Sequence, residues 1–165
     1  MTRIKSIGFP NSETEMSTLF DKLQRSTTSE LLTTGALAIH GSASALAKTV
    51  NTIYFMVDGQ MYSKTAADCA ALVGTVANAT FNVFVFSVNA AGTFATQMGT
   101  GAATLGGVVF PAVADGYVAV GFVIVNPTGT GAFTGGTIAL DDATVVPNAV
   151  YINTLGDFFP QYSTL

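Results

Sequence analysis

Two apolar segments constrain most strongly how this chain can fold. Residues 81–88 and 117–125 carry large apolar side chains at odd and even positions alike. An antiparallel strand with one face in water alternates apolar and polar residues instead. We therefore expect two strands that are covered on both faces. A second sheet is expected to cover one of these faces. The cover on the other side is expected to be the N-terminal region or a neighbouring subunit.

Shorter strand patterns, separated by turn residues, fill the chain from Asn51 onward. Asp58-Gly59 lies between residues 52–57 and 60–64 and supplies the positive φ angles of a tight hairpin turn. Further strands are expected at residues 93–97, 133–140 and 145–153, and one or two helical turns at 66–73. This pattern predicts a mainly β fold, either an antiparallel β-sandwich or a jelly-roll-like barrel. The strand order stays open.

The N-terminal region has a helical pattern instead. Ser12 and Glu15 have the spacing of a capping box, in which each side chain accepts from a free backbone N–H at the start of a helix. Four apolar residues follow at helical spacing: Met16, Leu19, Phe20 and Leu23. A short helix is marginal alone in water, so this stripe is expected to pack on the body or on another chain. We predict an N-terminal arm with a short amphipathic helix over residues 1–50 and a β-sandwich body over 51–165.

Charge is scarce and unevenly distributed. Charged residues make up 10% of the chain, against about 25% in a typical soluble domain. All six Lys and Arg residues lie within the first 64 positions, and the net charge is −4. This balance argues against nucleic-acid binding by bulk charge. We also expect no membrane association, because the purest apolar run, residues 117–125, is far shorter than the roughly 20 residues of a spanning helix.

Residues with catalytic chemistry are few. His40 is the only histidine and lies outside any Gly-x-Ser-x-Gly context, so we expect it at the surface or an interface. Cys69 has no base beside it in the sequence and is expected to be a small buried side chain. Asp141 and Asp142 lack the ligand spacing of a calcium loop and are expected in a solvated turn. We therefore predict a non-enzymatic protein without catalytic residues, cofactor or metal.

The order of the strand and turn segments resembles that of small virion proteins from tailed bacteriophages. The segments that carry the resemblance are the hairpin at 57–66, the Ser-Val-Asn-Ala-Ala-Gly-Thr turn at 87–93, the Phe-Pro-Ala segment at 110–112, the strand at 118–125 and the Phe-Thr-Gly-Gly-Thr segment at 133–137. Members of that group are capsid decoration (cement) proteins or head fibres. The resemblance implies a trimer on the capsid exterior, made in the bacterial host cytoplasm. Its partners would be the major capsid protein and further copies of itself.

Two contact surfaces are expected on this basis. The charge asymmetry points to the N-terminal region as the part that contacts the capsid, through Arg3, Lys5, Met16, Leu19, Phe20 and Leu23. The excess of apolar strand surface points to an oligomer interface formed by Phe84, Phe86, Val118, Val120 and Phe122. Neither surface requires a bound cofactor.

A receptor- or glycan-binding module of a phage fibre is the alternative. Exposed aromatic rings would then form a platform for a sugar, and the chain offers five tyrosines: Tyr54, Tyr62, Tyr117, Tyr151 and Tyr162. The chain has no tryptophan, the usual stacking residue in such platforms, and this absence weakens the alternative.

Overall fold

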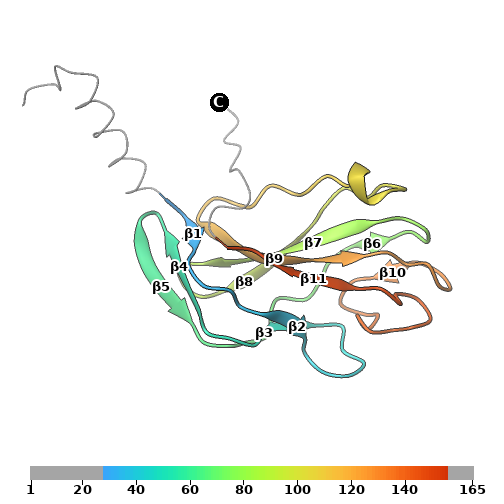
Figure 1. Cartoon of the computed structure of the whole chain (residues 1–165), viewed down its shortest axis with the longest axis horizontal. Helices are drawn as coiled ribbons and strands as arrows, with labels where there is room; N and C mark the ends of the chain where they lie inside the picture. Colours follow the sequence, from blue (N-terminus) through green and yellow to red (C-terminus); the bar gives the residue numbers. More distant parts are fainter. Residues whose placement is uncertain (1–27, 156–165) are drawn as a thin grey trace, which may run out of the picture.

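The computed structural model describes residues 28–155, which fold mainly into β-strands (Figure 1). The predicted fold class is confirmed. The elements are β1 (Glu30–Leu31), β2 (Leu37–Ile39), β3 (Ala47–Thr49), β4 (Ile53–Val57), β5 (Gln60–Lys64), β6 (Thr75–Val76), β7 (Asn82–Asn89), β8 (Phe94–Met98), the 3₁₀ turn η1 (Leu105–Gly107), β9 (Tyr117–Val125), β10 (Phe133–Thr134) and β11 (Val150–Asn153).

Two sheets form the layers of a β-sandwich. The larger sheet has the strand order β11-β9-β7-β8, and the smaller one has the order β1-β4-β5. Two further pairs, β2-β3 and β6-β10, extend the layers, and every pairing between named strands is antiparallel. The main core lies between the two sheets, where Phe55 of β4 and Phe86 of β7 are completely buried. The barrel alternative is not needed to describe this arrangement.

The predicted hairpin is confirmed as β4 and β5. Its register places Val57 opposite Gln60, so the turn contains only Asp58 and Gly59. Both turn residues have positive φ angles, 50° and 75°, as a two-residue turn of this hand requires. The strong local signal at Asp-Gly explains why this part of the fold was predictable.

The body begins earlier than the predicted boundary at residue 51. Leu31 of β1 pairs with Phe55 of β4, and β2 pairs with β3. Residues 30–49 therefore belong to the sandwich and not to an arm. The predicted amphipathic helix falls within residues 1–27, which lie outside the described residues.

Three smaller predictions need correction. Residues 66–73 are extended and not helical, since the backbone N–H of Cys69 donates to the carbonyl of Ala47 at 2.9 Å. The strand expected at 133–140 ends at Thr134, because Gly135 and Gly136 turn the chain, with φ +70° at Gly136. The strand expected at 145–153 begins only at Val150.

The doubly apolar strand β7 is covered on both faces, as expected, but the cover differs from the expectation. Phe84 and Phe86 point into the main core, whereas Val83 and Val85 point to the opposite face of the sheet. That opposite face is covered by the chain's own segment 99–116, through residues such as Val108 and Val113. The cover is therefore part of this protomer, in place of an N-terminal helix or a neighbouring subunit.

Strand β9 is also apolar on both faces because both faces are covered, and it contains a β-bulge. Its register against β7 shifts between Phe86 and Ser87, where Gly121 and Ala119 are the partners. The extra residue lets both Val120 and Val123 face the main core while Phe122 joins the outer cluster. Gly121 permits this bend with φ +156°.

The five residues expected at an oligomer interface are interior residues of one protomer. Their exposed fractions are 0% for Phe84, Phe86 and Val120, 3% for Val118 and 6% for Phe122. The main core and the segment 99–116 account for their apolar character. These side chains are therefore not available to a second copy in this structure, and an oligomer needs another surface.

Candidate functional site

A pocket of about 310 Å³ opens beside β3 and is lined by both polar and apolar side chains. The segment 66–69 runs along β3, because the N–H of Thr49 donates to the carbonyl of Ala67 at 2.9 Å. This pairing brings residues distant in sequence around one opening. The lining consists of His40, Lys48, Thr49, Val50, Ala66, Ala67 and Asp68.

His40 and Asp68 form the central polar contact of this pocket. The His40 Nδ1 and Asp68 Oδ1 atoms lie 2.5 Å apart, and each side chain is about half exposed, at 49% and 50%. A hydrogen bond to the carboxylate places a proton on Nδ1, so Nε2 is the nitrogen that a ligand would contact. The expected surface position of His40 is confirmed, and its partner was not predicted.

Cys69 does not complete a nucleophilic triad with this pair. In an extended backbone, consecutive side chains point to opposite faces, and Cys69 is buried in the core at 4% exposure while Asp68 is exposed. Burial, and secondarily the nearby Asp68 charge, raise the pKa of the Cys69 thiol to about 12. A thiol with this pKa carries almost no thiolate at neutral pH, so it is a poor nucleophile. Its prediction as a small buried side chain is confirmed.

The lining of the pocket favours binding over group transfer. The Thr49 hydroxyl donates to the Ala67 carbonyl at 3.3 Å and accepts from the Ala67 N–H at 3.1 Å. This hydroxyl is therefore engaged with the backbone. The remaining polar groups, on His40, Lys48 and Asp68, can donate to and accept from a polar ligand, beside the apolar side chain of Val50.

Asp142 stabilises its own turn, whereas Asp141 links that turn to the loop between β2 and β3. Asp142 Oδ1 accepts from the Thr144 hydroxyl at 2.6 Å and from the Thr144 N–H at 2.8 Å. These hydrogen bonds lower the pKa of the Asp142 carboxyl. Asp141 Oδ2 accepts from the N–H of Ala43 at 3.0 Å. Within residues 28–155, no three His, Cys, Asp or Glu side chains gather in a way that could hold a metal ion.

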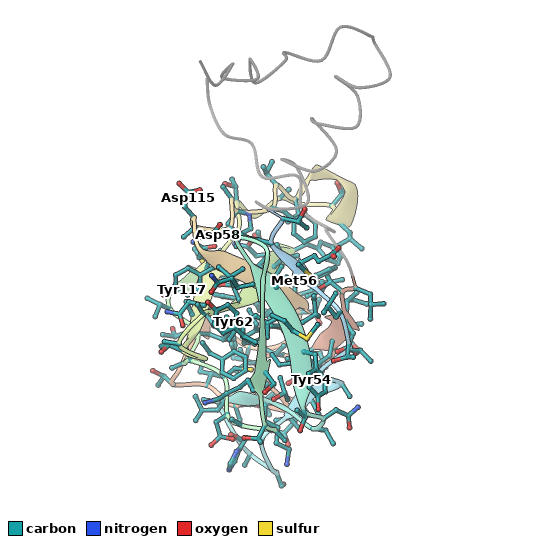
Figure 2. The ribbon with its side chains drawn as sticks, turned by 90° about the vertical axis from the view of Figure 1, so that its left-hand side faces the viewer. Tyr54, Met56, Asp58, Tyr62, Asp115 and Tyr117 are labelled. Carbon is teal, nitrogen blue, oxygen red and sulfur yellow. The ribbon has the colours of Figure 1, made fainter. Side chains whose placement is uncertain are left out.

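The outer face of the smaller sheet is a second candidate surface (Figure 2). The strand registers place five side chains on this side, which we call the hairpin face: Glu30, Tyr54, Met56, Met61 and Ser63. Met61 is 68% exposed and Tyr54 is 47% exposed, so large apolar area faces outward here. Sequence reasoning missed this face, because the alternation in the predicted hairpin separates two sides of β4 that both carry large apolar residues and does not show which side the core occupies.

The five tyrosines proposed as a sugar platform do not share one surface. Tyr62 lies on the inner side of β5 and stacks on Phe55, with ring centroids 5.9 Å apart, whereas Tyr54 lies on the outer side of β4. The hydroxyl of Tyr151 is buried, and burial, followed by the Asp141 charge, raises its pKa to about 12. Tyr162 lies outside the described residues.

The predicted capsid-contacting residues are not placed by the structure. Arg3, Lys5, Met16, Leu19, Phe20 and Leu23 all fall within residues 1–27, outside the described part of the chain. The expectation for them stays a prediction.

Comparison with known proteins adds no relative. No family model, curated protein or solved structure matches this chain. In the described part of the chain, no helix is long and apolar enough to span a membrane.

Proposed function

We propose that this chain is a non-enzymatic structural protein of a tailed-phage particle. It decorates the capsid exterior as a homotrimer and stabilises the shell by contacts with the major capsid protein. The order of strand and turn segments that resembles small virion proteins supports this proposal. The sandwich body is consistent with it, because a close-packed β-sandwich is a rigid scaffold for contact surfaces.

The observation that carries the proposal is the order of the strand and turn segments, and the apolar side chains that the body exposes add area for contacts. Three such residues outside the hairpin face are at least 60% exposed: Val73 at 73%, Leu155 at 61% and Val109 at 60%. Apolar side chains that are exposed singly are common on soluble proteins, so these residues supply contact area without marking one interface. A standard protein interface buries about 1,600 Å² in total, and repeated copies on a shell add avidity to each modest contact.

Capsid decoration is tested by co-assembly. The full chain is produced together with the major capsid protein encoded in the same genome, and shells are separated from free protein by gradient sedimentation. We expect the chain to sediment with the shells and to raise the temperature at which they disrupt. A chain that stays at the top of the gradient and leaves the disruption temperature unchanged would overturn the proposal. Light scattering of the free chain tests the trimer separately.

Glycan binding is the second candidate, because the pocket beside β3 combines polar groups with an apolar wall. His40, Lys48 and Asp68 offer donors and acceptors for sugar hydroxyls, and Val50 offers a contact for a sugar ring. A glycan array probed with the full chain tests this candidate. Binding that is lost in Asp68→Asn but kept in Asp115→Asn, a change far from the pocket lining, would favour it over decoration. An array without any bound glycan would exclude it.

A further inference from the structure

The hairpin face is a sheet surface without a partner in the described part of the chain. Its inner side packs Ile53 and Phe55 into the core at 0% exposure, while Tyr54 and Met61 on the outer side are 47% and 68% exposed. Met56 and Met61 lie directly opposite each other across β4 and β5, so their side chains form one continuous apolar area. Figure 2 shows the hairpin with Tyr54 and Met56 labelled on one side of it and Tyr62 on the other.

The chain enters the sandwich at the edge of this face. The N–H of Gly59 donates to the carbonyl of Thr28 at 2.9 Å, and the N–H of Asp58 donates to the hydroxyl of Ser29 at 3.1 Å. These bonds hold the start of β1 against the turn of the hairpin. The 27 residues that precede Thr28 are therefore attached directly beside the exposed apolar area.

We propose that the hairpin face is covered by the apolar stripe of the same chain, formed by Met16, Leu19, Phe20 and Leu23. The lengths agree. Leu23 lies five positions before Thr28, and these five steps along the chain can span up to about 17 Å, which is enough to reach Met56 from the start of β1. In a helix the stripe from Met16 to Leu23 is about 11 Å long. The five residues of β4 extend about 14 Å.

The charges near the entry point are complementary. Glu30 belongs to the hairpin face and Asp58 lies in the adjoining turn, whereas Lys22 and Arg25 are the charged residues closest before Thr28 along the sequence. Both cations lie within two residues of Leu23 in the sequence. Exposed ion pairs contribute little to stability, so charge selects the orientation and apolar burial supplies the stability.

The covered face has a consequence for capsid contact. The four stripe residues are then engaged within the protomer, which leaves Arg3 and Lys5 as the N-terminal residues available to a shell. The intramolecular contact is a property of the free chain. Its test needs no capsid and can fail without affecting the proposal of decoration.

Methionine oxidation in the full chain tests the contact. Hydrogen peroxide oxidises exposed methionine thioethers, and peptide mass spectrometry gives the rate for each site. Met98 on β8 is the internal reference, because it is 37% exposed and lies in the other sheet. We expect Met61 to oxidise more slowly than Met98, although Met61 is the more exposed of the two in the sandwich. Faster oxidation of Met61 than of Met98 in the unchanged chain would overturn the proposal.

Two variants with the same added charge distinguish the loss of the stripe contact from a general effect of the added charge. Leu19→Asp places a charge in the stripe, whereas Thr18→Asp places the same charge on the opposite side of a helix. We expect Leu19→Asp to raise the Met61 rate by about fivefold or more, because the face opens. The Met98 rate should stay unchanged, and Thr18→Asp should leave both rates unchanged. Equal Met61 rates in the two variants would contradict the contact.

Dilution distinguishes the same chain from a second copy. An intramolecular contact does not depend on protein concentration, whereas a contact between chains weakens by mass action. We expect Met61 protection to persist over roughly a hundredfold dilution. Protection that disappears on dilution would assign the face to a second copy and overturn the proposal.

Discussion

The ring of Phe110 meets the ring of Phe122 edge-on, with centroids 4.9 Å apart and planes inclined by 84°. Phe110 belongs to the segment 99–116, and Phe122 lies on the outer side of β9. Val108 and Val113 of the same segment pack beside this contact. The connection between β8 and β9 is therefore a third layer that keeps water from the outer face of the larger sheet.

Replacing Phe110 with alanine tests this layer. The change removes an aromatic pair and uncovers Phe122, so we expect the free energy of unfolding to fall by about 1–3 kcal/mol. Urea denaturation measures the loss. Leu105→Ala is the control, because Leu105 is 49% exposed in a 3₁₀ turn without buried residues, and its change should stay within about 0.5 kcal/mol. If the Phe110→Ala loss is no larger than the Leu105→Ala loss, the segment 99–116 covers the sheet without contributing to its stability.

The local part of the fold was predictable because its signals are contained in short stretches. Asp58-Gly59 specifies the turn, and the turn fixes the register of β4 and β5. The apolar character of residues 81–88 predicted burial on both faces correctly. It did not identify the cover, because the apolar residues of the segment 99–116 form only a short run at 108–110, which Pro111 interrupts, and show no helix or strand period.

The candidate site was less predictable, since it depends on pairing between distant segments. His40 and Asp68 are 28 residues apart and meet only because the segment 66–69 aligns with β3. The two-residue strand β1 is too short to leave a periodic signal, which is why the arm was predicted to extend to residue 50. The hairpin face required knowing which side of β4 the core occupies.

Gly121 is expected to be intolerant of any side chain. A Cβ atom there would lie 2.4 Å from the carbonyl oxygen of Ile152 and 2.5 Å from Leu37 Cδ1, at φ +156°. Because β11 pairs at this point, we expect Gly121→Ala to cost about 2 kcal/mol or more. Gly106→Ala is the matched control, with nothing within 4 Å of its Cβ, and should leave the thermal midpoint almost unchanged. Equal midpoints for the two variants would contradict the close approach at β11.

A substitution at Phe84 tests whether this residue belongs to the core of one protomer or to an interface between protomers. It is completely buried and meets Phe133 edge-on, with centroids 6.0 Å apart. We expect Phe84→Leu to lower the free energy of unfolding by about 1–2 kcal/mol through lost packing. The loss should be the same at every protein concentration, because the contact lies within one protomer. A destabilisation that grows on dilution would restore the interface expectation.

Cys69 should resist alkylation while the protein is folded. Its sulfur is buried, and its pKa is raised to about 12, so very little thiolate is accessible near pH 8. We expect iodoacetamide to label Cys69 rapidly in denaturing urea and hardly at all without it. Rapid labelling of the native chain would mean that the segment 66–69 opens readily from β3.

The same buried thiol makes stability depend on alkaline pH. The pKa of Cys69 is about 12 in the folded state and about 8.5 in an unfolded chain. The unfolded state therefore loses its proton first, so this contribution to stability is complete below about pH 8.5 and is lost as pH rises toward 12. We expect the free energy of unfolding to fall by about 1 kcal/mol between pH 9 and 10, and this slope to vanish in Cys69→Ala. A steeper fall above pH 10 should remain in that variant, because the pKa of Tyr151 is also raised to about 12. An unchanged slope between pH 9 and 10 in Cys69→Ala would assign the alkaline loss to other groups.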